Sequence, residues 1–155
     1  MNWFSMGWSP TGNMVGASAM VGYMSNDGEV AEGIIKQYYL AGKTNSGVLV
    51  DDGNLTVIQK SALVTMKNQT IYMAFQIEMD ESSASSSKLI YAYARTGQTP
   101  DENGNILVVH QASYRMSLDF TTGKHALWWQ TILALINLLY HKNKGNTVFN
   151  MCWLH

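Results

Sequence analysis

The alternation of side chains over residues 71–79 (IYMAFQIEM) limits the folds open to this chain more than any other pattern in it. Ile71, Met73, Phe75 and Ile77 recur every second residue and share one face, while their neighbours share the other. A period of two belongs to a β-strand with one buried face and does not fit the 3.6-residue period of a helix. We therefore expect a strand here, packed on a core.

Eight further short runs also indicate strands, and turn-forming residues separate many of them. Asn26-Asp27-Gly28, residues 51–54 (DDGN) and residues 101–105 (DENGN) are the clearest turns. The runs cover residues 3–8, 18–24, 34–40, 55–58, 62–66, 89–95, 106–109 and 116–120. About nine short strands predict an all-β fold, and a β-sandwich in particular.

Size and composition exclude several classes of protein. With 155 residues, the chain is long enough for one domain with a core. Its 46% hydrophobic residues and only 14% charged residues exclude a wholly disordered chain. A net charge of -1 without a basic run argues against nucleic acid as a partner. The single cysteine, Cys152, excludes an internal disulfide, a Cys-rich zinc site and a c-type haem attachment.

The pattern changes after residue 123, where strand-like runs give way to a 15-residue apolar stretch at 126–140 (ALWWQTILALINLLY). We therefore divide the chain into a sandwich at 1–123 and a hydrophobic tail at 124–155. The stretch predicts a short C-terminal helix packed on the sandwich or on a partner. Spanning a bilayer takes roughly 20 apolar residues, so membrane association through 126–140 is an alternative, as is a tail that does not fold.

Signature motifs of catalysis are missing: G-x-S-x-G, H-E-x-x-H, G-x-x-x-x-G-K-[ST] and G-x-G-x-x-G do not occur. The sequence therefore carries no recognised signature of a catalyst of bond chemistry. Two glycosylation sequons occur, at Asn54 and Asn68, and they matter only in the secretory pathway.

Two residues suggest redox chemistry. Met14 lies in a Gly-flanked loop between two predicted strands, and His110 ends an apolar strand. A thioether and an imidazole are the axial ligand pair of many electron-transfer haems. Because the chain has ten methionines and four histidines, residue chemistry alone does not select this pair. Packing against the core for Met14 and a half-exposed strand end for His110 are the structural alternatives.

Several segments, in the same order, resemble the DOMON domains of plant cytochrome b561 and DOMON domain-containing proteins. They lie within residues 2–123 and read 8–16 (WSPTGNMVG), 18–23 (SAMVGY), 35–40 (IKQYYL), 53–55 (GNL), 71–76 (IYMAFQ), 89–92 (LIYA) and 117–120 (SLDF). The resemblance implies an immunoglobulin-like β-sandwich. It also implies one non-covalent b-type haem (heme b), with Met14 and His110 as axial ligands of the iron.

By the same resemblance, we expect electron exchange with a cytochrome b561-type membrane core, with ascorbate as a possible donor. The haem would need an apolar slot, for which Met6, Trp8, Met20, Tyr23, Met73 and Phe75 have the right character, although sandwich core packing explains them equally. The alternatives are a sugar-binding or adhesion module that uses Tyr38, Tyr39, Tyr91 and Tyr93, and a truncated fragment without a function.

Family members carry a secretory signal and further histidine-bearing membrane helices, which this sequence does not match. We expect an N-terminally truncated or alternatively spliced relative. The family implies a membrane-associated location, at the extracellular face of the plasma membrane or in another secretory-pathway membrane. The missing signal makes a cytosolic location the alternative.

Overall fold

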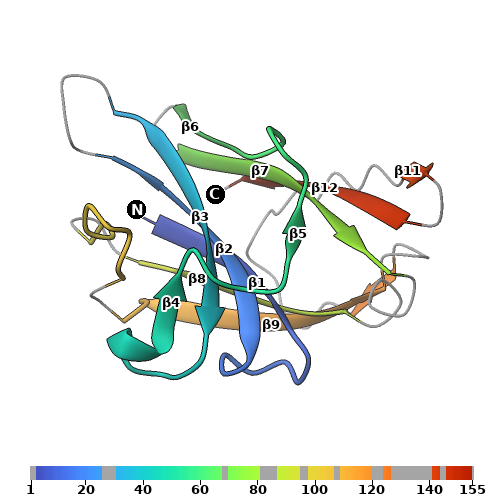
Figure 1. Cartoon of the computed structure of the whole chain (residues 1–155), viewed down its shortest axis with the longest axis horizontal. Coiled ribbons are helices and arrows are strands. Elements are labelled where there is room, and N and C mark those ends of the chain that lie inside the picture. Colours follow the sequence, from blue (N-terminus) through green and yellow to red (C-terminus); the bar gives the residue numbers. More distant parts are fainter. Residues whose placement is uncertain are drawn as a thin grey trace.

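Two antiparallel sheets form the protein in a computed structural model that describes residues 3–25, 31–67, 70–80, 87–94, 98–106, 109–119, 124–126, 141–143 and 146–154 (Figure 1). The larger sheet has seven strands in the order β10-β9-β8-β1-β2-β3-β4, with the N-terminal strand β1 at its centre. The bounds are β10 Lys124–Ala126, β9 Ala112–Asp119, β8 Ser87–Tyr93, β1 Trp3–Ser9, β2 Ala17–Met24, β3 Gly33–Leu40 and β4 Val48–Val50.

The smaller sheet is built around β7 (Thr70–Met79). Its order is β11-β12-β7-β5, with β6 also paired to β7. The bounds are β11 His141–Asn143, β12 Asn146–Leu154, β5 Thr56–Val57 and β6 Leu63–Lys67. A single turn of 3-10 helix, η1 (Asn45–Gly47), lies between β3 and β4.

Alternating side chains of β7 form the core between the sheets, as the period of two predicts. Ile71, Met73, Phe75 and Ile77 are at most 3% exposed. They pack with Phe4, Met6, Trp8, Met20, Val64 and Leu89 from the other strands, and the rings of Trp8 and Phe75 meet edge to face at 5.9 Å. This shared core confirms the all-β sandwich fold.

A second apolar cluster covers the outer face of the seven-stranded sheet. Trp3, Ala17, Ala19, Val21, Tyr23, Tyr38, Leu40 and Ala94 are buried in it. The central strands β1 and β2 are therefore buried on both faces, and nearly every residue in them is buried. The sheet thus has an apolar outer face in addition to the face that packs on the core.

Nine strands, β1 to β9, lie before residue 123, which agrees with the predicted number. Two positions differ. The short strand β4 at Val48–Val50 was not predicted, whereas Ile106 and Val109, at the ends of a predicted strand, lie outside any strand. Residues 107–108 lie outside the described residues.

Strands also occur beyond residue 123. β10 pairs with β9, and β12 pairs with β7 over eight residues, including Cys152 opposite Ala74. Ala126, where the predicted helix was to begin, ends β10, and residues 127–140 lie outside the described residues. The division at residue 123 and the helix stay predictions. Within the described part of the chain, no helix has the length and apolar character needed to cross a bilayer.

Candidate functional site

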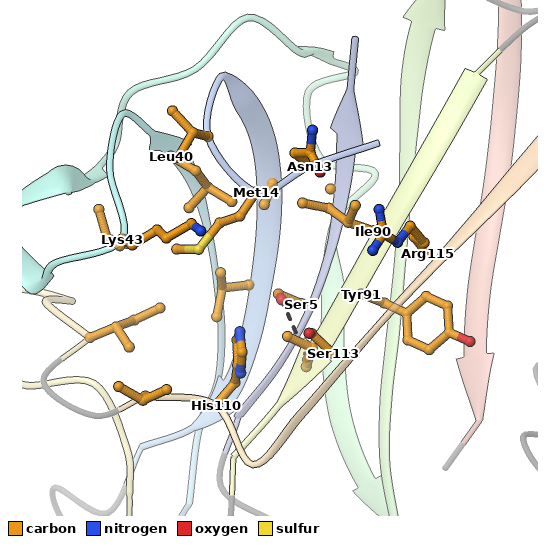
Figure 2. Close-up of a pocket in the computed structure, with 18 of the residues that line it drawn as sticks. Ser5, Asn13, Met14, Leu40, Lys43, Ile90, Tyr91, His110, Ser113 and Arg115 are labelled. Atoms are coloured by element: carbon orange, nitrogen blue, oxygen red, sulfur yellow. Dashed lines mark hydrogen bonds between the residues drawn. The ribbon is translucent and has the colours of Figure 1, made fainter. Parts of the chain in front are cut away.

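A pocket of about 550 Å³ opens on the outer face of the seven-stranded sheet (Figure 2). Its walls come from loop residues 12–15 and 43–45 and from Ile106, Val109 and His110, and its floor comes from β1, β2, β8 and β9. Cofactor pockets typically measure about 300–1,000 Å³ and are mostly apolar. This pocket therefore has the size and character of a cofactor site.

Small side chains on neighbouring strands make the floor. Ser5 of β1 lies opposite Ala92 of β8, which in turn lies opposite Ser113 of β9. One step along the sheet, Gly7 of β1 lies opposite Ala19 of β2. All five residues line the pocket. None of the five carries a large side chain, and the Ile90 side chain packs close beside Gly7, where a Cβ atom would lie 3.0 Å from it.

Met14 enters the pocket from the loop between β1 and β2. This loop is held from inside: the buried Ser9 hydroxyl donates to the Asn13 carbonyl at 2.6 Å and accepts from the Gly12 N–H at 2.9 Å. The Gly16 N–H bonds the carbonyl of Leu40 at 2.8 Å, which ties the loop to β3. Met14 itself is partly buried and packs against the outer apolar cluster.

His110 enters from the segment before β9. The next residue, Gln111, donates its backbone N–H to the carbonyl of Tyr93 at 2.8 Å and so fixes this segment against β8. His110 is partly buried and lines the pocket, while its neighbour Val109 is 73% exposed. The imidazole is therefore at the edge of the pocket, with the pocket interior on one side and the exposed Val109 on the other.

The fold brings the two predicted ligand residues to one pocket. Figure 2 shows the Met14 thioether and the His110 imidazole directed into the same space from opposite ends. They come from loops far apart in the sequence, and the pairing of β1 with β2 and with β8 brings them together. Ligation by this pair stays a prediction.

The predicted slot residues lie elsewhere. Met6, Trp8, Met20, Met73 and Phe75 belong to the core between the sheets, which confirms the structural alternative for them. Tyr23 is buried in the outer cluster but does not line the pocket. The strand alternation explains this, because the pocket is lined by the odd-numbered residues of β1, whereas Met6 and Trp8 point the opposite way.

Three of the tyrosines considered for sugar stacking are engaged in packing. Tyr38 is fully buried, its hydroxyl donates to the Gly104 carbonyl, and burial raises the pKa of this hydroxyl well above its ordinary value. Tyr91 stacks on Tyr114 at 5.2 Å, and burial raises its pKa as well. Tyr93 packs against the inner core. Tyr39 is partly buried.

Other candidate groups are limited. Among the described residues, no cluster of three or more His, Cys, Asp or Glu side chains could hold a metal ion. A methionine–histidine pair is a different kind of site. Of the sequons, Asn54 is exposed and its backbone N–H donates to Ser18 Oγ at 2.8 Å, while Asn68 lies outside the described residues.

Two proteins of Arabidopsis thaliana are similar to this chain, and each is named a cytochrome b561 and DOMON domain-containing protein. One is 30% identical over 122 residues, which is 79% of this chain and 32% of the relative. The other is 40% identical over 76 residues, which is 49% of this chain and 18% of the relative. The chain thus spans at most about a third of either relative.

No family model matches the chain. No solved structure matches it either. The two relatives, with the sandwich fold described above, support a family relationship between this chain and the cytochrome b561 and DOMON domain-containing proteins.

Proposed function

We propose that the chain is an electron-transfer domain that binds one b-type haem in the outer pocket, with Met14 and His110 as axial ligands. The observation that carries the proposal is the convergence of these two side chains on one apolar pocket (Figure 2). The names of the two relatives add support, because each name includes the words cytochrome b561.

The residues present fit a haem. A macrocycle needs an apolar cavity of sufficient size, which the volume of about 550 Å³ and the small floor residues offer. It also needs one donor atom on each side, and Met14 and His110 reach the pocket from opposite ends. The strand residues Val21, Leu40 and Val48, which also line the pocket, supply apolar contacts.

Met14 and His110 would have different effects on the redox behaviour of the bound haem. When bound, the haem iron supplies a one-electron couple. The soft Met14 sulfur favours the ferrous state and raises the potential, whereas the His110 nitrogen supports both oxidation states. Together Met14 and His110 would hold the iron from both sides and leave no open site on it for oxygen. The chain would then pass single electrons and carry out no bond chemistry.

The rim of the pocket is open beside each of the two ligand residues. Val15 follows Met14 and is 45% exposed, and Val109 precedes His110 and is 73% exposed. An exposed edge is what electron exchange with another molecule requires. A cytochrome b561-type membrane core and a small donor such as ascorbate are the proposed partners, and a membrane-associated location follows from the same proposal.

The test is the visible spectrum of the full chain reconstituted with haemin, first oxidised and then reduced with dithionite. The proposal predicts a low-spin spectrum that sharpens on reduction into the bands of a b-type cytochrome. A folded chain that takes up no haemin would refute the proposal. Circular dichroism of the same sample establishes that the chain is folded.

A further inference from the structure

We infer that the pocket selects a ligand with anionic groups, and that Lys43 and Arg115 are the residues that bind them. The inference rests on the proposed function and names the part of the haem that each side chain meets: its carboxylate groups. Lys43 and Arg115 would set the orientation and the affinity of the bound haem, whereas Met14 and His110 would bind its iron.

The charge of the pocket lining carries the inference. Among the described residues that line it, the formally charged ones are Lys43, from the loop after β3, and Arg115, from β9, and none is an aspartate or glutamate. In the part of the chain that the structure describes, neither cation forms an ion pair, whereas Lys36 is paired with Asp51 at 3.0 Å. The lining therefore presents positive charge without a counter-charge.

The position of the two cations fits the open side of the pocket. Both side chains are exposed, and Figure 2 shows Lys43 on the side of the pocket toward which Met14 points and Arg115 on the other side, next to Ile90. Across the sheet, Arg115 lies opposite Ile90, which is beside the floor residue Gly7. An amphipathic ligand can thus bury its apolar part on the floor and leave its acid groups at the rim.

Desolvation and charge pairing both favour a bound ligand whose apolar part is buried and whose acid groups stay at the rim. An apolar ring gains free energy by leaving water for the floor, while a carboxylate loses free energy if it is buried without a partner. Arg115 can bind a carboxylate through two parallel N–H donors, and Lys43 supplies a point charge on a flexible stem. The cations therefore favour the orientation in which the acid groups face solvent.

Haemin and its dimethyl ester, in which both carboxylates are neutral, test the inference on the full chain. We compare the wild type with Lys43→Gln, Arg115→Gln and the double variant. Lys67→Gln is the matched control, because Lys67 is an exposed cation on β6 and does not line the pocket. The readouts are the dissociation constant at two salt concentrations and the low-spin spectrum.

Each exposed ion pair makes a small contribution to binding, so the double variant, which loses two, should bind haemin about twofold to thirtyfold more weakly than the wild type. The ester should bind the wild type and the double variant equally, and added salt should weaken haemin binding mainly in the wild type. The low-spin spectrum of bound haem should persist in every cation variant.

The outcomes separate the two proposals. If the double variant binds haemin as tightly as the wild type and the Lys67→Gln control, the assignment of Lys43 and Arg115 is wrong while the electron-transfer function stands. If the folded wild type binds neither haemin nor the ester, the proposed function is wrong, and the assignment falls with it.

Discussion

Ser9 Oγ donates a hydrogen bond of 2.6 Å to the carbonyl oxygen of Asn13 and thereby closes the loop that carries Met14. The same oxygen accepts the N–H of Gly12, which has a positive φ of 84°. One buried hydroxyl thus satisfies two backbone groups on either side of the turn. These hydrogen bonds hold the backbone that carries Met14 in place without a ligand.

Replacing Ser9 with alanine should destabilise the fold and loosen Met14. The buried Gly12 N–H would lose its partner, which costs about 1–3 kcal/mol in free energy of unfolding. The reconstituted haem should then show a mixture of low-spin and high-spin signals. Thr11→Ala is the control, because Thr11 is exposed and makes only 3.3 Å contacts with Asn13. Equal effects of the two variants on the spectrum would contradict the role of Ser9.

Enlarging the floor should close the pocket. Ala92 lies between Ser5 and Ser113 across the sheet, so the side chain of Ala92→Leu would occupy the cavity. We expect haemin affinity to fall at least tenfold while the far-ultraviolet circular dichroism stays unchanged. Ala74→Leu is the matched control, because Ala74 is a partly buried strand alanine on β7 and does not line the pocket. Unchanged haemin binding by Ala92→Leu would show that the ligand lies elsewhere.

Gly33 lies at a close contact between the two sheets. A Cβ atom at this position would lie 1.9 Å from the carbonyl oxygen of Val64 on β6, so the strands would have to separate. Gly33→Ala should lower the free energy of unfolding by about 1–3 kcal/mol or more. Gly42→Ala, whose Cβ would meet its nearest neighbour at 3.5 Å, should change it by less than about 0.5 kcal/mol. Urea unfolding of both variants measures the difference, and a stable Gly33→Ala variant would contradict the packing described.

Asp101 should make the loop before His110 sensitive to acid. Hydrogen bonds from the Asn105 side chain, then from backbone N–H groups of the same loop, lower the pKa of this carboxyl below its ordinary value of 3.8. A lowered folded-state pKa contributes stability above the unfolded value and loses it as the pH falls through the folded one. Wild type should therefore lose stability below about pH 4 more steeply than Asp101→Asn. Parallel acid-unfolding curves for the two proteins would contradict this.

Strand positions were predictable because buried apolar residues recur at every second position of a half-buried strand, as in β7. β4 was missed because Val48–Val50 is too short to show a period. The amide of Gln37 pairs with both backbone groups of Leu55, at 2.7 and 3.2 Å, and a contact over that sequence separation leaves no local pattern.

The ligand pair and the pocket were predictable to different degrees. Met14 and His110 were proposed from the family resemblance, since their chemistry alone did not distinguish them from other methionines and histidines. The floor was missed because Ser5, Gly7 and Ala92 are small, and small residues produce no hydrophobic signal. Their alternation with Phe4, Met6 and Trp8 was nevertheless present in the sequence and could have indicated a hollow outer face.

Axial ligation by Met14 and His110 is the central claim, and magnetic circular dichroism of the reconstituted oxidised protein tests it most directly. The near-infrared charge-transfer band distinguishes methionine–histidine ligation from other low-spin pairs. We predict this band in the wild type and in Met66→Leu, a control methionine exposed on β6. It should be absent from Met14→Leu, and His110→Ala should lose the low-spin spectrum. A wild-type band that survives in both Met14→Leu and His110→Ala would contradict the assignment.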